Sequence, residues 1–274
     1  MSRAHLAVLA IALLASTATT VQAQRPQFQT TKVDGTDNVY IFRYGNHQSM
    51  FVVTRDGVIA TDPIGLARPQ AVTAYVEEIK KITDKPVKYV IYSHHHYDHI
   101  AGGKPFKDQG AVFVAHENVR KRLAPLADPD TVLPDRNVGN GGTVITLGGT
   151  RLELHYLGRN HSDSSLVMRL PKEKIIFAVD FLPVGQVPGI AMVDSNPLEW
   201  EDSIKKVLAM DWERLISRPS RSRRPARHQG GCAELAGPAA GRLGRGEDSC
   251  ARRQVLGDGG EGVQAGEICK LAGI

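Results

Sequence analysis

Four histidines and an aspartate are crowded into six residues just after an apolar segment. The segment 87–92 is almost continuously apolar, which is typical of a buried strand. The candidate metal ligands that follow it are His94, His96, Asp98 and His99. On a tight loop, residues two apart can point the same way, while the next pair faces a neighbouring position. This spacing predicts a site for two adjacent divalent ions; a solvated histidine cluster without metal is the alternative.

The donor types narrow the choice of metal. Imidazole and carboxylate bind zinc at about 2.0 to 2.2 Å, and two zinc ions about 3.5 to 4 Å apart can share a hydroxide. The cysteines, Cys232, Cys250 and Cys269, all lie near the C-terminus. A core without cysteine offers metal no thiolate and has no disulfide staple. We therefore expect zinc, two ions per chain, held by nitrogen and oxygen.

The remaining pattern predicts one α/β domain with mixed sheets covered by helices. Strands are expected at 39–42, 50–53, 58–60, 87–92, 111–115, 166–170 and 175–178, with a hairpin turned at 148–149. Helices are expected at 69–82, at 117–126 and from Pro197 to about Met210. Asn196 and Glu199 form a capping-box pattern at the start of the last helix.

Residues 1–23 have the pattern of an export signal. Arg3 precedes an apolar stretch at 6–15, and Ala23 ends a small-residue cleavage pattern. An uncleaved membrane anchor is the alternative, although the stretch is short for a bilayer. No later run is long and apolar enough to span a membrane. We expect a periplasmic or secreted protein with no membrane contact after signal cleavage.

The motif His94-x-His96-x-Asp98-His99, followed by Gly102-Gly103, resembles the signature of the metallo-β-lactamase superfamily. The resemblance covers roughly residues 39–215. It implies a four-layer αββα sandwich within residues 24–216, an α/β (α+β) fold that is incomplete at its C-terminal end. A motif with this many metal-binding groups at fixed spacing is far more specific than any one of them.

The resemblance also implies residues further along the chain. His161 corresponds to the third imidazole of the first metal site, and Asp180 to a carboxylate that bridges both metals. Asp62 resembles an early aspartate that supports the histidine loop. Taken singly, each has an ordinary structural reading, as a loop histidine, a strand-end carboxylate or a turn residue.

The implied activity is hydrolysis of a small molecule. Zinc would lower the pKa of a water towards about 7 for attack on an acyl or phosphoryl centre. Asp98 is suited to orient that nucleophile and carry a proton, which makes it the catalytic candidate. The alternatives are an inactive metal-binding pseudoenzyme and a mononuclear-iron enzyme similar to sulfur dioxygenases. Loop shapes, which the sequence does not give, determine the substrate.

Three other residues are not assigned as metal ligands. His95 and Tyr97 fall between the candidate ligands, and we assign them packing or supporting roles. His47 follows Gly45 and Asn46 in a turn pattern. It could line the substrate mouth, but an exposed hairpin histidine is the favoured interpretation.

Residues 217–274 differ abruptly in composition. No aromatic residue follows Trp212, and this segment carries ten basic against six acidic residues. The family usually supplies a last histidine from a Pro-Gly-His loop, but here the sequence is Ser217-Arg218-Pro219-Ser220. The codons TCC-CGG-CCA-TCC would encode these residues, and reading one nucleotide later gives Pro-Gly-His.

We therefore hypothesise a frameshift near Ile216 and an aberrant tail, disordered from about Arg218. Loss of the last histidine should weaken the second metal site and impair activity. Two alternatives remain: a genuine basic tail for nucleic acid, disfavoured because it lacks interleaved aromatics, and His228 as a replacement ligand. We predict no nucleic-acid partner.

Overall fold

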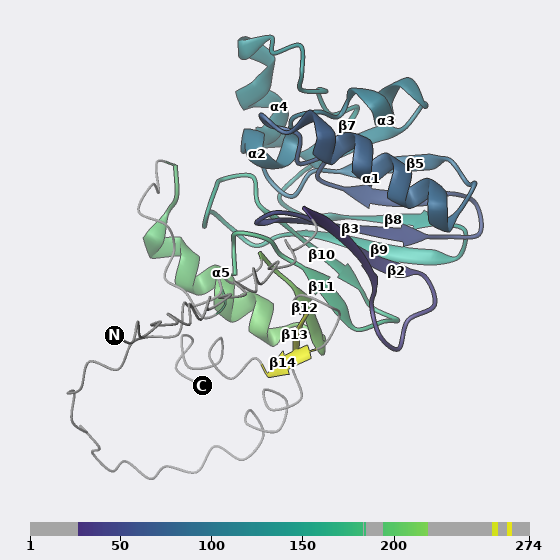
Figure 1. Ribbon diagram of the computed structural model, residues 1–274. Coiled ribbons are helices and arrows are strands. Elements are labelled where there is room, and N and C mark those ends of the chain that lie inside the picture. Colours follow the sequence, from purple (N-terminus) through teal and green to yellow (C-terminus); the bar gives the residue numbers. More distant parts are fainter. Residues whose placement is uncertain (1–26, 183, 185–193, 219–253, 257–261, 265–274) are drawn as a thin grey trace, which may run out of the picture.

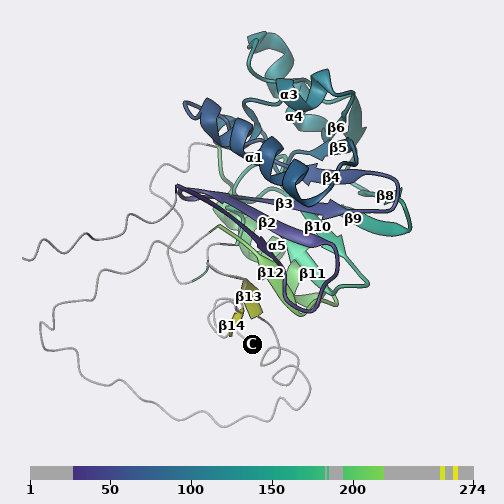
Figure 2. The same ribbon diagram turned by 45° about the vertical axis from the view of Figure 1, so that its right-hand side comes forward.

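Two sheets lie face to face, with helices on both outer sides (Figure 1). The computed structural model describes residues 27–182, 184, 194–218, 254–256 and 262–264. The helices are α1 Pro69–Ile82, α2 Tyr97–Ile100, α3 Lys104–Asp108, α4 Glu117–Leu123, a 3-10 turn at Ala124–Leu126, and α5 Pro197–Ala209. Helices α1, α3 and α4 cover one sheet and α5 covers the other (Figure 2). The expected αββα sandwich is confirmed.

The first sheet has seven strands in chain order. They are β1 Phe28–Lys32, β2 Val39–Tyr44, β3 His47–Val53, β4 Val58–Thr61, β5 Val87–Ile91, β6 Val112–His116 and β7 Arg136–Val138. The strands β1 to β4 form an antiparallel meander, of which β2, β3 and β4 were expected as strands, while β4 to β7 are parallel. Since β4 and β5 are parallel, Asp62 and the histidine loop follow their strands at the same edge.

The second sheet also has seven strands. They are β8 Thr143–Leu147, β9 Thr150–Tyr156, β10 Leu166–Leu170, β11 Ile175–Phe177, β12 Arg214–Ile216, β13 Gln254–Leu256 and β14 Gly262–Gln264. Strands β11 and β12 are parallel, with Phe177 opposite Ile216. The segments that follow these two strands therefore leave the sheet side by side, and they carry Asp180 and Arg218.

Apolar side chains fill three layers. Residues such as Met50, Ile91 and Met168 pack between the two sheets. Tyr75 of α1 and Phe106 of α3 pack on the outer face of the first sheet. Trp200 of α5 packs with Val167 and neighbours on the outer face of the second. Burial on both faces explains why β11 is continuously apolar and β4 nearly so, rather than alternating.

The start of α5 matches the sequence expectation. The Asn196 side chain accepts a hydrogen bond from the Glu199 amide at 3.1 Å, and Pro197 occupies the first helical turn. The Asn196 amide donates to the Asn160 carbonyl at 2.8 Å. The cap thus also fixes the loop that carries His161.

The described part of the tail differs from our expectation. Strand β13 pairs in parallel with β12, and β14 pairs antiparallel with β13 (Figure 1). The expectation of a tail disordered from about Arg218 does not hold for residues 254–256 and 262–264, because short β-capable stretches can pair with the open edge of β12. His228, the cysteines and the predicted signal at 1–23 lie outside the described residues. None of the helices in the described part of the chain has the length and apolar character needed to cross a bilayer.

Candidate metal centre

The ligand candidates meet where several strands end. His94 and His96 follow β5, Asp98 and His99 lie in α2, His161 follows β9, and Asp180 follows β11. The structure brings all six together. Potential ligand atoms of His94, His96 and His161 lie within 4.8 Å of one another, as do those of His94, His99 and Asp180. The segments are far apart in sequence, so the fold, not local spacing, assembles this cluster.

The first group brings three imidazole rings together, and one of their buried nitrogens has no partner among the described residues. His94 Nε2 is buried and has no hydrogen-bond partner among the described residues, while its Nδ1 lies 2.9 Å from Ser93 Oγ. His96 Nδ1 lies 3.1 Å from His161 Nε2. A buried polar atom without a partner costs free energy, and converging imidazoles without an acid between them fit a cation. The residues present therefore fit a metal ion.

Burial sets the protonation of this group. Desolvation lowers the pKa of His94 well below its ordinary value and lowers the pKa of His161 to about 4, and neighbouring histidines add to the effect. Both imidazoles are thus neutral at pH 7, which is the form that binds metal.

The second group consists of Asp98, His99 and Asp180. His99 Nε2 lies 3.3 Å from Asp180 Oδ2 and 3.8 Å from Asp98 Oδ2. Asp180 Oδ2 also lies 3.7 Å from His161 Nε2, so this carboxylate stands between the two groups. Asp180 Oδ1 is buried and has no partner among the described residues. The position of Asp180 suits the bridging role that the sequence suggested.

The charged side chains around the second group shift one another's pKa. Burial alone would raise the pKa of Asp180, but His99 and Arg218 hold it well below the ordinary range. Burial opposes a charge on His99 as well, yet Asp180 and Asp62 raise its pKa well above the usual value. Without metal, His99 is therefore a protonated partner of two carboxylates, and a metal ion must displace that proton.

Asp62 supports the histidine loop as the resemblance implied. The Ser93 amide donates to its Oδ1 at 2.7 Å, and the Ser93 hydroxyl donates to its Oδ2 at 2.5 Å. His99 Nδ1 lies 3.0 Å from the same Oδ2. Asp62 is fully buried, and these contacts set the ring orientation of His99 with Nε2 towards the site.

The favoured interpretation of His47 is wrong. Its side chain is only 11% exposed, and its Nε2 lies 3.0 Å from Asp98 Oδ2. The Arg68 guanidinium contacts His47 Nδ1 and donates a second hydrogen bond to the Asp98 carbonyl at 3.0 Å. Because a guanidinium only donates, Nδ1 must accept, so Nε2 carries the proton and donates it to Asp98. Arg68 and His47 thus fix the orientation of the catalytic candidate.

Replacing Arg68 with methionine should lower hydrolytic activity about 10- to 100-fold, the usual range for residues that orient metal ligands. The physical reason is that His47 loses the donor that fixes its tautomer, so Asp98 loses a constant hydrogen bond. Steady-state kinetics on a hydrolysed substrate measure the effect. Arg55→Met is the matched control, since Arg55 is exposed and pairs with its neighbour Asp56. Equal activity of the two variants would contradict this role.

Sequence reasoning missed Asp194. Its carboxylate lies 3.0 Å from His96 Nε2 and 2.9 Å from His95 Nε2. With Nε2 of His96 held by this acid, Nδ1 is left for the site, which is the usual carboxylate–histidine pairing at metal centres. His95 also contacts Ser164 Oγ at 2.7 Å, which agrees with the supporting role assigned to it. No sequence motif identified Asp194. Its position two residues before the Asn196 cap indicated only that it lies in the loop before the last helix.

A hollow of about 420 Å³ lies beside the histidine loop. Its walls are His95, His96, Tyr97, Arg122, Leu123 and Leu126. The lining is mostly apolar at one side, with imidazole at the other. The hollow can therefore receive an organic group next to the candidate metal ligands.

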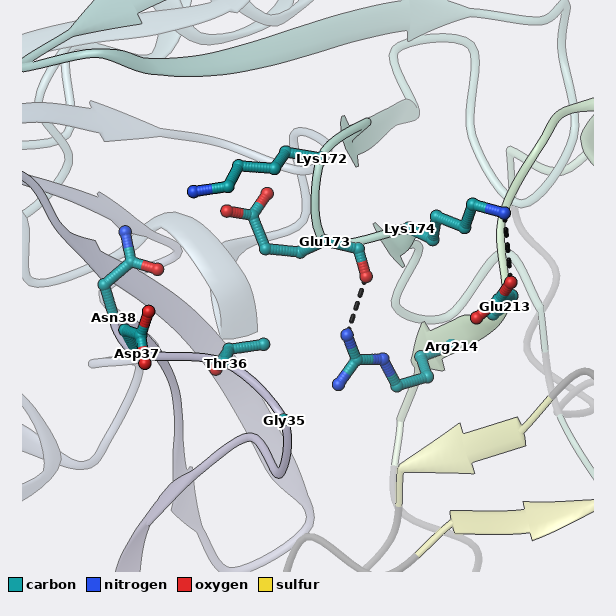
Figure 3. A pocket seen from close by; sticks show the side chains of 9 residues that line it. All are labelled: Gly35, Thr36, Asp37, Asn38, Lys172, Glu173, Lys174, Glu213 and Arg214. Atoms are coloured by element: carbon teal, nitrogen blue, oxygen red, sulfur yellow. Dashed lines mark hydrogen bonds and ion pairs between the residues drawn. The ribbon is translucent and has the colours of Figure 1, made fainter.

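A second hollow, of about 300 Å³, lies at the opposite ends of β11 and β12 (Figure 3). Acidic and basic side chains line it together, including Lys174, which pairs with Glu213 at 3.0 Å. Arg214 donates to the Glu173 carbonyl at 2.7 Å. Lys174, Glu213 and Arg214 are thus already partnered, and the lining has neither histidine nor cysteine. The histidine cluster is the stronger candidate for the functional site.

Known proteins are similar in sequence to about half or more of this chain. Subunit alpha of 2,4-dinitroanisole O-demethylase from Nocardioides sp. (strain JS1661) is 25% identical over 193 residues, 70% of this chain and 57% of its own length. A metallo-beta-lactamase type 2 from Bacillus sp. (strain 170) is 28% identical over 142 residues, 48% of this chain and 51% of its own length. The chain thus spans only about half the length of these relatives.

Solved structures share the fold. A metallo-beta-lactamase from Pontibacter korlensis superposes with a TM-score of 0.62 at 22% identity, covering 70% of this chain and 91% of that one. DIM-1 metallo-beta-lactamase exposed to ceftazidime gives 0.62 at 16% identity, covering 91% and 97%. The family model described as metallo-beta-lactamase superfamily matches residues 43–216, well over half of the chain. This protein belongs to the metallo-beta-lactamase superfamily.

Proposed function

We propose that this protein is a zinc-dependent hydrolase that opens an acyl bond of a small molecule. The observation that carries the proposal is the convergence of His94, His96 and His161 around a buried, unpartnered imidazole nitrogen. Zinc bound there would supply a Lewis acid and a water of lowered pKa. Superfamily membership makes hydrolysis the general chemistry; the metal and the substrate class are the proposed parts.

The chain's own residues supply positioning and proton transfer. Asp98, held by His47 and Arg68, presents its carboxylate at the edge of the site and accepts a proton from the attacking water. Its pKa is held well below the ordinary range: burial opposes this, but the hydrogen bond from His47 and the nearby histidines outweigh burial. The carboxylate is therefore ionised and able to act as a base at neutral pH.

The hollow beside the histidine loop suits a substrate with an apolar group. Leu123 and Leu126 offer an apolar wall, and Tyr97 adds an aromatic face. Lactams, lactones, esters and thioesters all combine such a group with a carbonyl carbon that water can attack. A phosphoryl substrate would also accept attack by water, but this lining offers only one cation, Arg122, which is already paired with Asp163.

The test is a substrate panel on the zinc-loaded protein. The panel includes a β-lactam, a lactone, a thioester, a phosphodiester and an aryl methyl ether, the last because of the demethylase relative. We expect turnover of at least one acyl substrate, abolished by chelation and restored by zinc. Zinc bound tightly with no turnover of any member would overturn the hydrolase proposal and favour a metal-binding pseudoenzyme. Preferential loading and activity with iron would overturn the assignment of zinc.

We also propose export to the periplasm or outside the cell, on the basis of the signal pattern at 1–23. N-terminal sequencing of the secreted protein should begin at Gln24. A protein that retains Met1 and stays in the cytoplasm would contradict export. The frameshift near Ile216 remains a proposal as well, and sequencing the gene at that codon tests it.

A further inference from the structure

The position of the missing last histidine is next to a cation of this chain. Arg218 Nη1 lies 3.4 Å from Asp180 Oδ2, and the Asp180 side chain is only 5% exposed. We propose that Arg218 takes over the charge of the second metal ion, so that the chain holds one divalent ion tightly and disfavours a second. The inference rests on the metal-dependent function proposed above.

The backbone brings Arg218 to this place. Phe177 and Ile216 are opposite each other in parallel strands, so the residues just beyond them leave at the same edge. The Ala178 amide donates to the Ile216 carbonyl at 3.0 Å, which extends the pairing past β11. The two segments therefore stay adjacent up to Asp180 and Arg218.

A buried side chain fixes the segment before Arg218. Gln48 Nε2 donates to the Ser217 carbonyl at 2.9 Å, and both residues are buried. Gln48 lies in β3, so this bond ties the end of β12 to the first sheet. The arginine is thus anchored at its base, and its guanidinium is directed at the site rather than free in solvent.

The two halves of the site differ in how many of their polar side-chain atoms already have a hydrogen-bond or ion-pair partner. In the first, His94 Nε2 is buried without a partner among the described residues. In the second, Asp98 Oδ2 is held by His47, His99 Nδ1 by Asp62, and Asp180 Oδ2 by both His99 and Arg218. A metal entering the first half meets His94 Nε2, which has no other partner among the described residues. A metal entering the second half finds Asp180 Oδ1 without a partner there, but it must displace the contacts of His99 and Arg218 with Asp180 Oδ2.

Arg218 and a second ion compete for the same oxygen. A divalent ion bound by Asp180 and His99 would lie only a few ångströms from the guanidinium, and like charges at that distance repel strongly. Arg68, which holds His47 and the Asp98 carbonyl, adds a second guanidinium on this side of the site. The second half of the site is therefore neutralised from within the chain.

Metal titration of the full-length, metal-free protein tests the inference. Zinc binding is followed by calorimetry, and cobalt(II) binding by absorption spectra, for the original chain, Arg218→Gln and Arg218→Lys. We expect one tight ion in the original chain. Arg218→Gln should strengthen binding of a second ion by at least about tenfold, because it removes the like-charge repulsion. Arg218→Lys keeps the charge and should behave like the original chain.

Three results would overturn the inference: two equally tight ions in the original chain, an unchanged second ion in Arg218→Gln, or a strengthened one in Arg218→Lys. Two equally tight ions in the original chain would overturn the inference even if a variant fails to fold. Absence of any tight ion would contradict the metal-dependent function itself. A single tight ion without turnover would leave the role of Arg218 supported and the hydrolase proposal refuted.

Discussion

Replacing His161 with alanine is expected to remove the tightly bound metal and about a thousandfold of the hydrolytic rate. The metal contributes several kcal/mol of charge stabilisation in the transition state, and about 4 kcal/mol corresponds to that factor. His161 supplies one of three imidazoles, and its Nε2 lies 3.1 Å from His96 Nδ1. Metal analysis of the purified variant, together with kcat/KM, measures both effects.

The matched control is His155→Ala. His155 is a more exposed histidine of the preceding strand β9 and pairs with Glu153 at 3.2 Å. This variant should retain both metal and rate. If His161→Ala kept its metal and its rate, the assignment of the first site would be wrong.

Replacing Asp62 with alanine is expected to lower the free energy of unfolding of the metal-free protein by about 3 to 5 kcal/mol, the cost of breaking a buried charged pair. The change removes the acceptor of His99 Nδ1 and leaves the Ser93 amide and hydroxyl without their acceptor. Urea denaturation followed by circular dichroism gives the value.

Asp56→Ala is the control for Asp62→Ala. Asp56 lies in the turn between β3 and β4, its side chain is exposed, and a change there should stay within about 0.5 kcal/mol. Asp62→Asn keeps an acceptor for the Ser93 amide and should lose less than the alanine variant. Equal stability of Asp62→Ala and Asp56→Ala would show that Asp62 does not hold the loop.

The sequence predicted the sandwich well because its elements carry strong local signals. The mostly apolar sequences of β4, β5 and β10 indicate buried strands. Asn196 with Pro197 marks the start of α5. Strands β1 and β7 were not predicted, since they are edge-strand segments with mostly polar, partly exposed side chains. Strands β13 and β14 were missed because pairing to β12, rather than their own composition, defines them.

The candidate site, like the fold, was predicted only in part from the sequence. A dense motif identified the histidine loop, and family order located His161 and Asp180, which the structure places beside it. The residues that orient those groups carry no such signal. His47, Arg68 and Asp194 reach the site only because β3, the start of α1 and the loop before α5 converge there. Such long-range placement depends on tertiary packing, which spacing along a chain does not encode.

Near Arg218 the sequence departs from the family pattern, and the structure shows which contact is made there instead. The sequence showed only that the expected histidine was absent. The structure shows that the residue beside that position pairs with Asp180. An absent ligand and a cation in its place both lower affinity for a second ion, and the titration of Arg218→Gln separates the two causes.

The central claim is that three imidazoles hold one metal ion at the end of β5. A crystal of the zinc-loaded protein, measured on both sides of the zinc absorption edge, tests it most directly. The account predicts an anomalous peak about 2.0 to 2.1 Å from His94 Nε2, His96 Nδ1 and His161 Nε2. Zinc located instead among His95, His96 and Asp194, or no peak near His94, would contradict it.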